Sequence, residues 1–120
     1  MKIVIAGAFP GLNQFIDANR IGRGRWNKGN AMKQRDMKLI ADQLPKWHTD
    51  RPVRISYFYF CPNAKKDLDN VSGYFHKVFQ DALVQRGVIP NDSWKYIKGF
   101  SDDFHIDKAN PRIEVEITEV

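Results

Sequence analysis

Residues 52–61 read Pro-Val-Arg-Ile-Ser-Tyr-Phe-Tyr-Phe-Cys, the strongest strand signal in the chain. The segment begins with alternating apolar and polar residues and then becomes aromatic at consecutive positions, a composition that favours the extended conformation. We expect both faces of its second half to be covered. The strand leads directly into Pro62 and then into the acidic stretch Lys65-Lys66-Asp67-Leu68-Asp69-Asn70. It would therefore hold that stretch on a rigid support.

Apolar residues recur at helical spacing in two segments that flank this strand. The first segment predicts a helix over about 30–44. The second has an unbroken apolar stripe and predicts a helix over about 70–85, which Asp69 or Asn70 can cap and Gly87 can end. The stripe of the second helix indicates a buried core face rather than a ligand site.

Three further segments have strand character. Residues 2–8 begin with β-branched side chains, residues 93–101 form a third strand followed by a polar turn over 102–111, and residues 112–119 alternate between apolar and polar. The resulting order is β-α-β-α-β-β. It predicts a single α/β (α+β) domain over residues 1–120, with a mixed sheet packed with two helices.

The bulk composition limits the class of protein. A chain of 120 residues with 42% hydrophobic residues can bury one core. Nineteen basic against 14 acidic residues give a net charge of +5, which favours a nucleic-acid partner. A single cysteine excludes an internal disulfide and fits a reducing compartment. The chain has no apolar run long enough for a membrane helix, and its apolar start reads as a strand, so we expect a cytoplasmic protein without a membrane partner.

Positive charge is concentrated between residues 20 and 38, where seven basic residues accompany one acid. Residues 9–30 look irregular and mix arginine with glycine and Trp26, a composition that suits contact with phosphates and an unstacked base. A solvated, flexible loop is the alternative. The candidate DNA-binding residues are Arg20, Arg23, Arg25, Lys28 and Lys33 in this region, and Lys65 and Lys66 beside the acidic motif.

Asp67 and Asp69 are two residues apart. In an extended segment both would point the same way, with Leu68 directed to the core. Asp92 follows the connector of the next helix, and it would join the pair if that connector returns beside the strand over 52–61. Three carboxylates repel one another unless a cation neutralises them, and hard oxygen ligands favour Mg²⁺, with Mn²⁺ as a substitute.

A metal site of this kind can hydrolyse a phosphodiester, and a neighbouring lysine can stabilise the charge that develops. Lys65, Lys66 and Lys77 are the candidates for that lysine. The alternative is a surface turn with capping acids and solvated lysines.

The chain resembles the RusA-type Holliday junction resolvases, a family common in prophages. The resemblance rests on Lys66-Asp67-Leu68-Asp69-Asn70, on Asp81-Ala82-Leu83, on Gly87 with Asp92 five residues later, and on the closing alternating strand. It covers essentially the whole chain. It implies a Mg²⁺-dependent endodeoxyribonuclease that resolves four-way DNA junctions in recombination and repair and works as a homodimer. It also implies that Asp67, Asp69 and Asp92 are its catalytic, metal-binding residues.

One position departs from the family pattern. In the type member the catalytic lysine follows the second aspartate by four residues, and Gly73 occupies that position here. The interval from Asp69 to Asp81 is longer than the family spacing by four residues, and counting back four from Asp81 gives Lys77. An insertion of just over one helical turn moves a residue by ~6 Å and ~40°. The resemblance therefore implies Lys77 as the catalytic lysine, with Lys66 as the alternative.

Two other functions stay open on the residues alone. One is a non-catalytic nucleic-acid-binding module whose acids are structural. The other is a related metal nuclease that acts on other branched DNA or on RNA.

Overall fold

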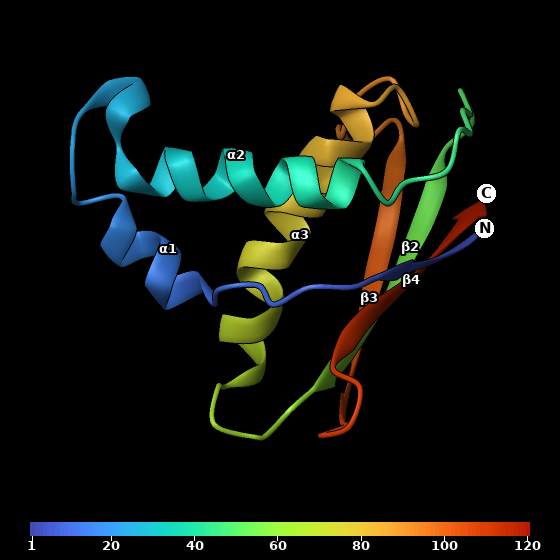
Figure 1. The fold of residues 1–120 in the computed structure, drawn as a ribbon. Coiled ribbons are helices and arrows are strands. Elements are labelled where there is room, and N and C mark those ends of the chain that lie inside the picture. The colour runs from blue at the N-terminus through green and yellow to red at the C-terminus, as the bar shows by residue number, and fades with distance from the viewer.

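The computed structural model describes the backbone of all 120 residues and every side chain except that of Arg25. The chain forms one compact α+β domain whose helices all lie on one face of a mixed sheet (Figure 1). The strand order is β1-β4-β2-β3, and only β2 and β3 pair in parallel. The elements are β1 (Lys2–Ile5), α1 (Leu12–Ala18), the 3-10 helix η1 (Gly24–Trp26), α2 (Lys28–Ala41), β2 (Val53–Cys61), α3 (Leu68–Gln85), β3 (Ile97–Ile106) and β4 (Arg112–Glu119).

The strand predicted over 52–61 is β2, and it lies inside the sheet between β4 and β3. Tyr57 and Tyr59 face the helices and are fully buried. The opposite face carries no helix. There Phe60 is partly exposed, with the His105 ring 5.0 Å away between ring centroids and the Arg112 guanidinium 3.9 Å above the ring. The prediction that both faces of the second half of β2 are covered is therefore confirmed for the face toward the helices and wrong for the opposite face.

The helix predicted over 70–85 is α3, which begins two residues earlier than expected. Phe75 and Phe79 stack at 5.5 Å, and both meet the Tyr57 ring edge-on. Gly87 ends the helix as predicted, because its φ of +70° is unfavourable for other residues. None of the described helices has the length and apolar character that crossing a membrane requires.

Helix α1 falls within the region that the sequence indicated to be irregular, so the domain has three α-helices rather than two. A helix of seven residues is not stable by itself in water, and α1 is held by its contacts with α3. The Phe15 ring packs 5.0 Å from the Tyr74 ring. Leu12 lies over Gly73 so closely that a Cβ atom at position 73 would stand 3.0 Å from the leucine side chain.

The helix predicted over 30–44 is α2, but it ends at Ala41. The residues after Ala41 are not helical, and Gln43 among them contacts the chain near β1. The side-chain amide of Gln43 accepts a hydrogen bond from Ala6 N at 2.8 Å and donates one to Ala6 O at 2.9 Å. These two bonds tie the end of α2 to the segment that follows β1, and β1 itself ends at Ile5 rather than at residue 8.

The third strand is displaced from its predicted position. Residues 93–96 form a turn, and β3 continues through 102–106, which was expected to be a polar turn. Asp102 points toward the helices, where Tyr59 Oη donates to it at 2.9 Å and His76 Nε2 lies 2.6 Å away. Because this carboxylate is satisfied, the strand accommodates it. The final strand, β4, has the predicted bounds.

Candidate functional site

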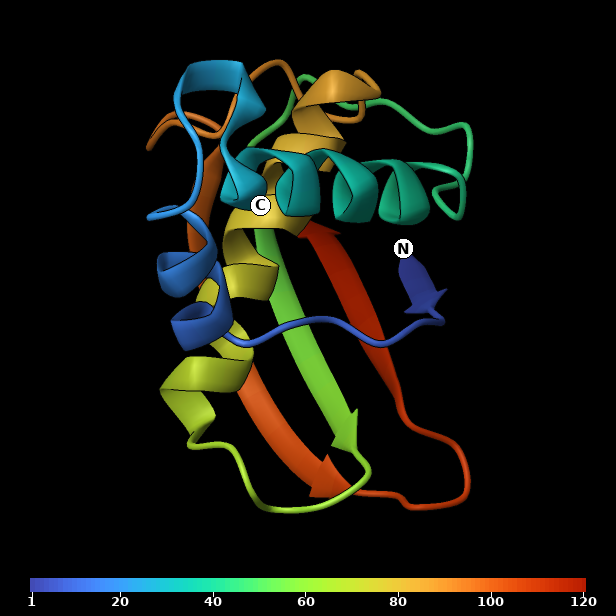
Figure 2. The same cartoon turned by 60° about the vertical axis from the view of Figure 1, so that its left-hand side comes forward.

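The acidic motif leads into α3, whereas Asp92 comes seven residues after its last residue, Gln85, so the two lie at opposite ends of the helix. The two ends of α3 are far apart in the domain (Figure 2). The 18 residues of the helix span ~27 Å. Asp67 stands just before its start, after the end of β2. Asp92 follows its C-terminal connector, five residues before Ile97, which pairs with Val53 at the beginning of β2. The connector therefore returns to the wrong end of β2, and the expected approach of Asp92 to the pair does not occur within one chain.

The pair itself also differs from expectation. Because α3 begins at Leu68, Asp67 is the N-cap residue and Asp69 belongs to the first helical turn. Residues two apart on a helix are rotated by ~200°, so the two carboxylates do not share one direction as they would on a strand. Leu68 is 58% exposed and does not point to the core.

Neither carboxylate of the pair is used in a structural contact among the described side chains. Asp67 makes no capping hydrogen bond, although it occupies the capping position. Both residues are exposed, at the end of the helix where the backbone dipole favours negative charge. These two acids therefore do not cap the helix through their side chains, as the structural alternative required.

A three-carboxylate metal site does not fit a single chain. Mg²⁺ and Mn²⁺ need several oxygen ligands that converge on one point. In the described part of the chain, no group of three or more His, Cys, Asp or Glu side chains is placed to hold a metal ion. Asp67 and Asp69 remain together at one end of α3, and Asp92 is exposed at the other.

The last residue of the motif has a role that sequence reasoning missed. Asn70 Oδ1 accepts a hydrogen bond from Asn13 N at 2.8 Å, which satisfies a backbone donor in the first turn of α1. Lys66 Nζ donates to Gln14 Oε1 at 3.3 Å, and the same oxygen accepts from Gly11 N. These contacts join the loop over 62–67 and the start of α3 to the start of α1.

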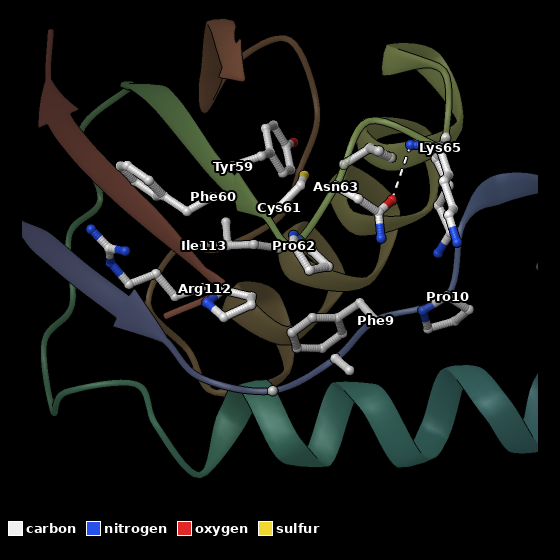
Figure 3. Close-up of a pocket in the computed structure, with 15 residues that line it drawn as sticks. Phe9, Pro10, Tyr59, Phe60, Cys61, Pro62, Asn63, Lys65, Arg112 and Ile113 are labelled. Atoms are coloured by element: carbon white, nitrogen blue, oxygen red, sulfur yellow. Dashed lines mark hydrogen bonds between the residues drawn. The ribbon is translucent and has the colours of Figure 1, made fainter. Parts of the chain in front are cut away.

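A cavity of about 430 Å³ opens where β2 ends (Figure 3). Its walls come from residues 7–10, from the end of β2, from the loop over 62–66 and from the start of β4. Most of them are apolar, and Lys65, Lys66 and Arg112 add positive charge. A second hollow of about 390 Å³ lies against the same loop and includes Asp67 and Leu68 in its lining. The loop over 62–67 therefore borders both hollows.

The positive groups around the first cavity are not equivalent. Arg112 is neutralised, because it donates to Glu114 Oε2 at 2.8 Å and to Asp107 Oδ2 at 3.0 Å. The pKa of Glu114 is lowered, first by the hydrogen bond from Lys2 and then by that from Arg112. Neither lysine of the loop over 62–67 has an acidic partner among the described residues, so these two are the cations available to an anionic ligand.

Of the other predicted DNA-binding residues, Arg20 and Arg23 are exposed in the segment that joins α1 to α2, and Lys28 is exposed at the first position of α2. The side chain of Arg25 lies outside the described residues. Lys33 forms an ion pair with Asp81 of α3 at 2.5 Å, so its charge is engaged inside the domain. This basic segment lies beyond the end of α1 that is remote from the acidic motif (Figure 1).

Lys77 is exposed on α3, eight residues beyond Asp69. That spacing places it ~12 Å further along the helix and rotated by ~80°. Gly73, four residues after Asp69, is covered by Leu12. A side chain at position 73 would press on the Leu12 side chain, because its Cβ atom would stand 3.0 Å from it.

No protein-family model matches this chain, and a search of the curated proteins gives no match either. The features that bear on its function are therefore those of the site itself. They are two unpaired carboxylates, two lysines without an acidic partner in the described part of the chain, and the cavity beside them.

Proposed function

We propose that the protein is a structure-selective endodeoxyribonuclease that binds branched DNA where β2 ends and resolves four-way junctions in recombination and repair in the cytoplasm. One observation carries the proposal. Asp67 and Asp69 are unpaired among the described side chains and follow directly on Lys65 and Lys66 in the chain. Both lysines line the first cavity, and Asp67 lines the second hollow together with Lys66. Lysines bind phosphate, and carboxylates left without a cationic side chain are suited to a divalent cation such as Mg²⁺ or Mn²⁺.

Asp92 enters this proposal only through a second copy of the chain. Helix α3 keeps it from Asp67 and Asp69 of its own chain. A homodimer in which the start of α3 in one copy meets the connector after α3 in the other would assemble all three acids. Two-fold symmetry would then form two equal sites, as paired cuts in a four-way junction require.

Lysines on both sides of the acids complete the proposal. Lys65 and Lys66 would hold the phosphate next to the cleaved bond. Lys77 lies along α3 and would contact a phosphate further along the same strand. In this arrangement Lys66 takes the position nearest to the acids, and Lys77 supports binding.

The proposal is tested by cleavage of a labelled four-way junction in Mg²⁺ by the wild-type protein, by Asp69→Asn and by Asp103→Asn. Asp103 is exposed on β3 and provides a control with the same change of charge. We expect symmetric cuts by the wild type and by the control. Asp69→Asn should bind the junction at least as well, because a negative charge beside DNA is removed, and should not cut it. Equal losses in both variants would contradict a specific role for Asp69.

The separation of the three acids within one chain favours a second candidate, a nucleic-acid-binding module without catalysis. The same assay decides between the two. If the wild type binds junctions but leaves junction, flap, linear duplex and RNA uncut in Mg²⁺ and in Mn²⁺, the nuclease proposal fails and the binding module stands. Cleavage of flap or RNA in preference to the junction would identify a related nuclease with another substrate.

A further inference from the structure

The cavity at the end of β2 has the size and lining of a site for one small aromatic group. Its volume of about 430 Å³ lies in the ~300–1,000 Å³ range of small-molecule pockets. Phe9, Pro62 and Ile113 surround its centre (Figure 3). The Phe9 ring packs edge-on against the buried Phe75 ring at 5.2 Å, which holds it at the cavity wall. An apolar cavity lined in part by an aromatic ring is suited to a flat aromatic group.

The polar groups of the cavity add a second requirement. Lys65 and Lys66 bring positive charge that no acidic side chain neutralises among the described residues, so the ligand carries negative charge at that side. Asn63 Oδ1 accepts a hydrogen bond from Lys65 N at 3.0 Å. This bond orients the amide, and its Nδ2 group is left to donate to a ligand acceptor. An aromatic ring with edge acceptors, joined to an anion, satisfies these groups together.

We propose that this cavity receives a single unpaired nucleotide of a DNA strand, with its base inside the chamber and its phosphate at Lys65 and Lys66. A base inside the cavity has left its partner and its stack, so a base of a continuous duplex would first have to unpair and unstack. The inference rests on the proposed function for the identity of the ligand as DNA. It adds that the site selects a nucleotide lifted out of the stack, which is what a branch point offers more readily than a continuous duplex.

Cys61 provides a native reporter for this cavity. It is the single cysteine of the chain, and it contributes to the lining. Its thiol is half-buried, and burial raises its pKa while Lys66 opposes that effect. Cys61 also lines the neighbouring hollow, so alkylation by iodoacetamide, followed by intact mass, reports a ligand in either of them, and the variants described below separate the two. A base inside it would shield the thiol.

The experiment compares the alkylation rate of the wild-type protein with four additions: a short thymidine oligodeoxynucleotide, an abasic oligomer of the same length, a blunt duplex and thymidine monophosphate. We expect the thymidine oligomer to slow alkylation by about 10-fold or more. Stacking of one base on an aromatic side chain raises binding affinity by roughly 5- to 150-fold, which is in line with this protection. The abasic oligomer and the duplex should protect far less at equal phosphate concentration. Equal protection by the abasic oligomer would overturn the inference, and equal protection by the monophosphate would identify a free nucleotide as the ligand and overturn it as well.

A pair of variants locates the ligand. Ala8 lines this cavity and Ala64 lines the neighbouring hollow, and both are exposed. Ala8→Trp should weaken binding of the thymidine oligomer by about 10-fold, whereas Ala64→Trp should leave it within about two-fold. The reverse order would place the ligand in the other hollow and contradict the inference.

Failure of this inference differs from failure of the proposed function. If the junction is bound and cut while Cys61 stays fully reactive, the nuclease stands and the nucleotide cavity is rejected. If the thymidine oligomer protects Cys61 and no junction is cut in Mg²⁺, the cavity stands and the nuclease is rejected.

Discussion

The two ends of α3 use their charged side chains differently. Toward the C-terminal end, Asp81 pairs with Lys33 of α2, and Arg86, just past the helix, donates to Asp42 at 3.0 Å. At the N-terminal end, Asp67 and Asp69 have no such partner among the described side chains. The charges of one end thus join two helices, and those of the other end are left to solvent or to a ligand.

The difference indicates where function and stability should respond to mutation. An ion pair between helices contributes to folding, and its loss appears in the free energy of unfolding. An exposed acid at a helix N-terminus contributes at most ~1 kcal/mol through the helix dipole, so its loss leaves folding almost unchanged. Variants of the N-terminal end should therefore change activity with little change in stability, and variants of the C-terminal half should do the opposite.

The largest effect is expected from the acids at the two ends. Asp69→Asn and Asp92→Asn should each reduce junction cleavage by at least about 100-fold. Mutation of a residue that only hydrogen-bonds to a metal ligand already lowers metal affinity or activity by ~10–100-fold, and loss of a ligand should cost more. Mixed dimers of the two variants, prepared by co-expression with two tags, separate two arrangements. If each site takes Asp92 from the other copy, the mixed dimer has one intact site and nicks one strand.

A site built within one chain would leave every site of the mixed dimer with one defect, and no nick would form. Asp103→Asn in place of Asp92→Asn is the control, since it should leave one active site in the mixed dimer whichever arrangement holds. Failure of the mixed dimer to nick, with the control active, would contradict the shared site and with it the proposed role of Asp92.

The next effect concerns stability. Asp36 of α2 is 2% exposed, and Tyr74 Oη of α3 donates to it at 2.6 Å. Tyr74→Phe removes that donor and leaves the buried carboxylate with the weaker contact from Arg35 Nε at 3.3 Å. We expect a loss of ~1–3 kcal/mol in the free energy of unfolding, measured with urea, and no change in cleavage at a temperature where the variant is folded. Tyr96→Phe, at a partly exposed position, should change stability by less than ~0.5 kcal/mol.

The sequence predicted the elements that carry their own pattern. Helix α3, β2 and β4 have long apolar stripes or strict alternation, and their ends agree with the structure to within two residues. Helix α1 has no such pattern because it is short, and it is formed through the contact of Leu12 with Gly73, which joins residues far apart in the chain. A contact of that kind leaves no local signal.

In the candidate site, too, the features that follow from contiguous sequence were predicted and those that depend on distant segments were not. The exposure of Asp67 and Asp69 and the nearness of Lys65 and Lys66 follow from a motif that is contiguous in sequence. The prediction that Asp92 joins the pair required the connector after the second helix to return to the end of the strand over 52–61. The length of the predicted helix already argued against such a return. A helix over 70–85 spans ~24 Å, so its two ends cannot meet unless the connector crosses back over the whole domain. The cavity depends on residues from four separate segments and could not be predicted from any one of them.

A smaller effect should separate the two groups of basic residues. Lys33→Met breaks the ion pair with Asp81, whose side chains are only 21% and 29% exposed, and should cost about 1 kcal/mol of stability without a change in DNA affinity. Lys28→Met removes an exposed charge and should leave stability unchanged. If the basic segment contacts phosphates, its loss should reduce the slope of log K against log salt by about 1. Weaker DNA binding by Lys33→Met at unchanged fold would contradict its assignment as a structural residue.

The smallest effect concerns the chain just past the C-terminal end of α3. His48 Nδ1 lies 2.6 Å from Gly87 O, and its Nε2 lies 2.9 Å from Asp50 Oδ1. Both partners are acceptors, so both contacts are hydrogen bonds only when the ring is doubly protonated. The pKa of His48 is therefore raised, first by the bond to the Gly87 carbonyl and then by that to Asp50.

A raised pKa in the folded state stabilises the fold fully below the unfolded value of about 6.5, and this contribution is lost as the pH rises through the folded value. The free energy of unfolding should accordingly decline from pH 6 upward over that interval. His48→Gln should remove this part of the decline, measured by urea unfolding at successive pH values, and His105→Gln on the open face of the sheet should not. An unchanged slope in His48→Gln would show that the imidazole does not stabilise the end of α3, and only the ion pairs would then distinguish this end from the other.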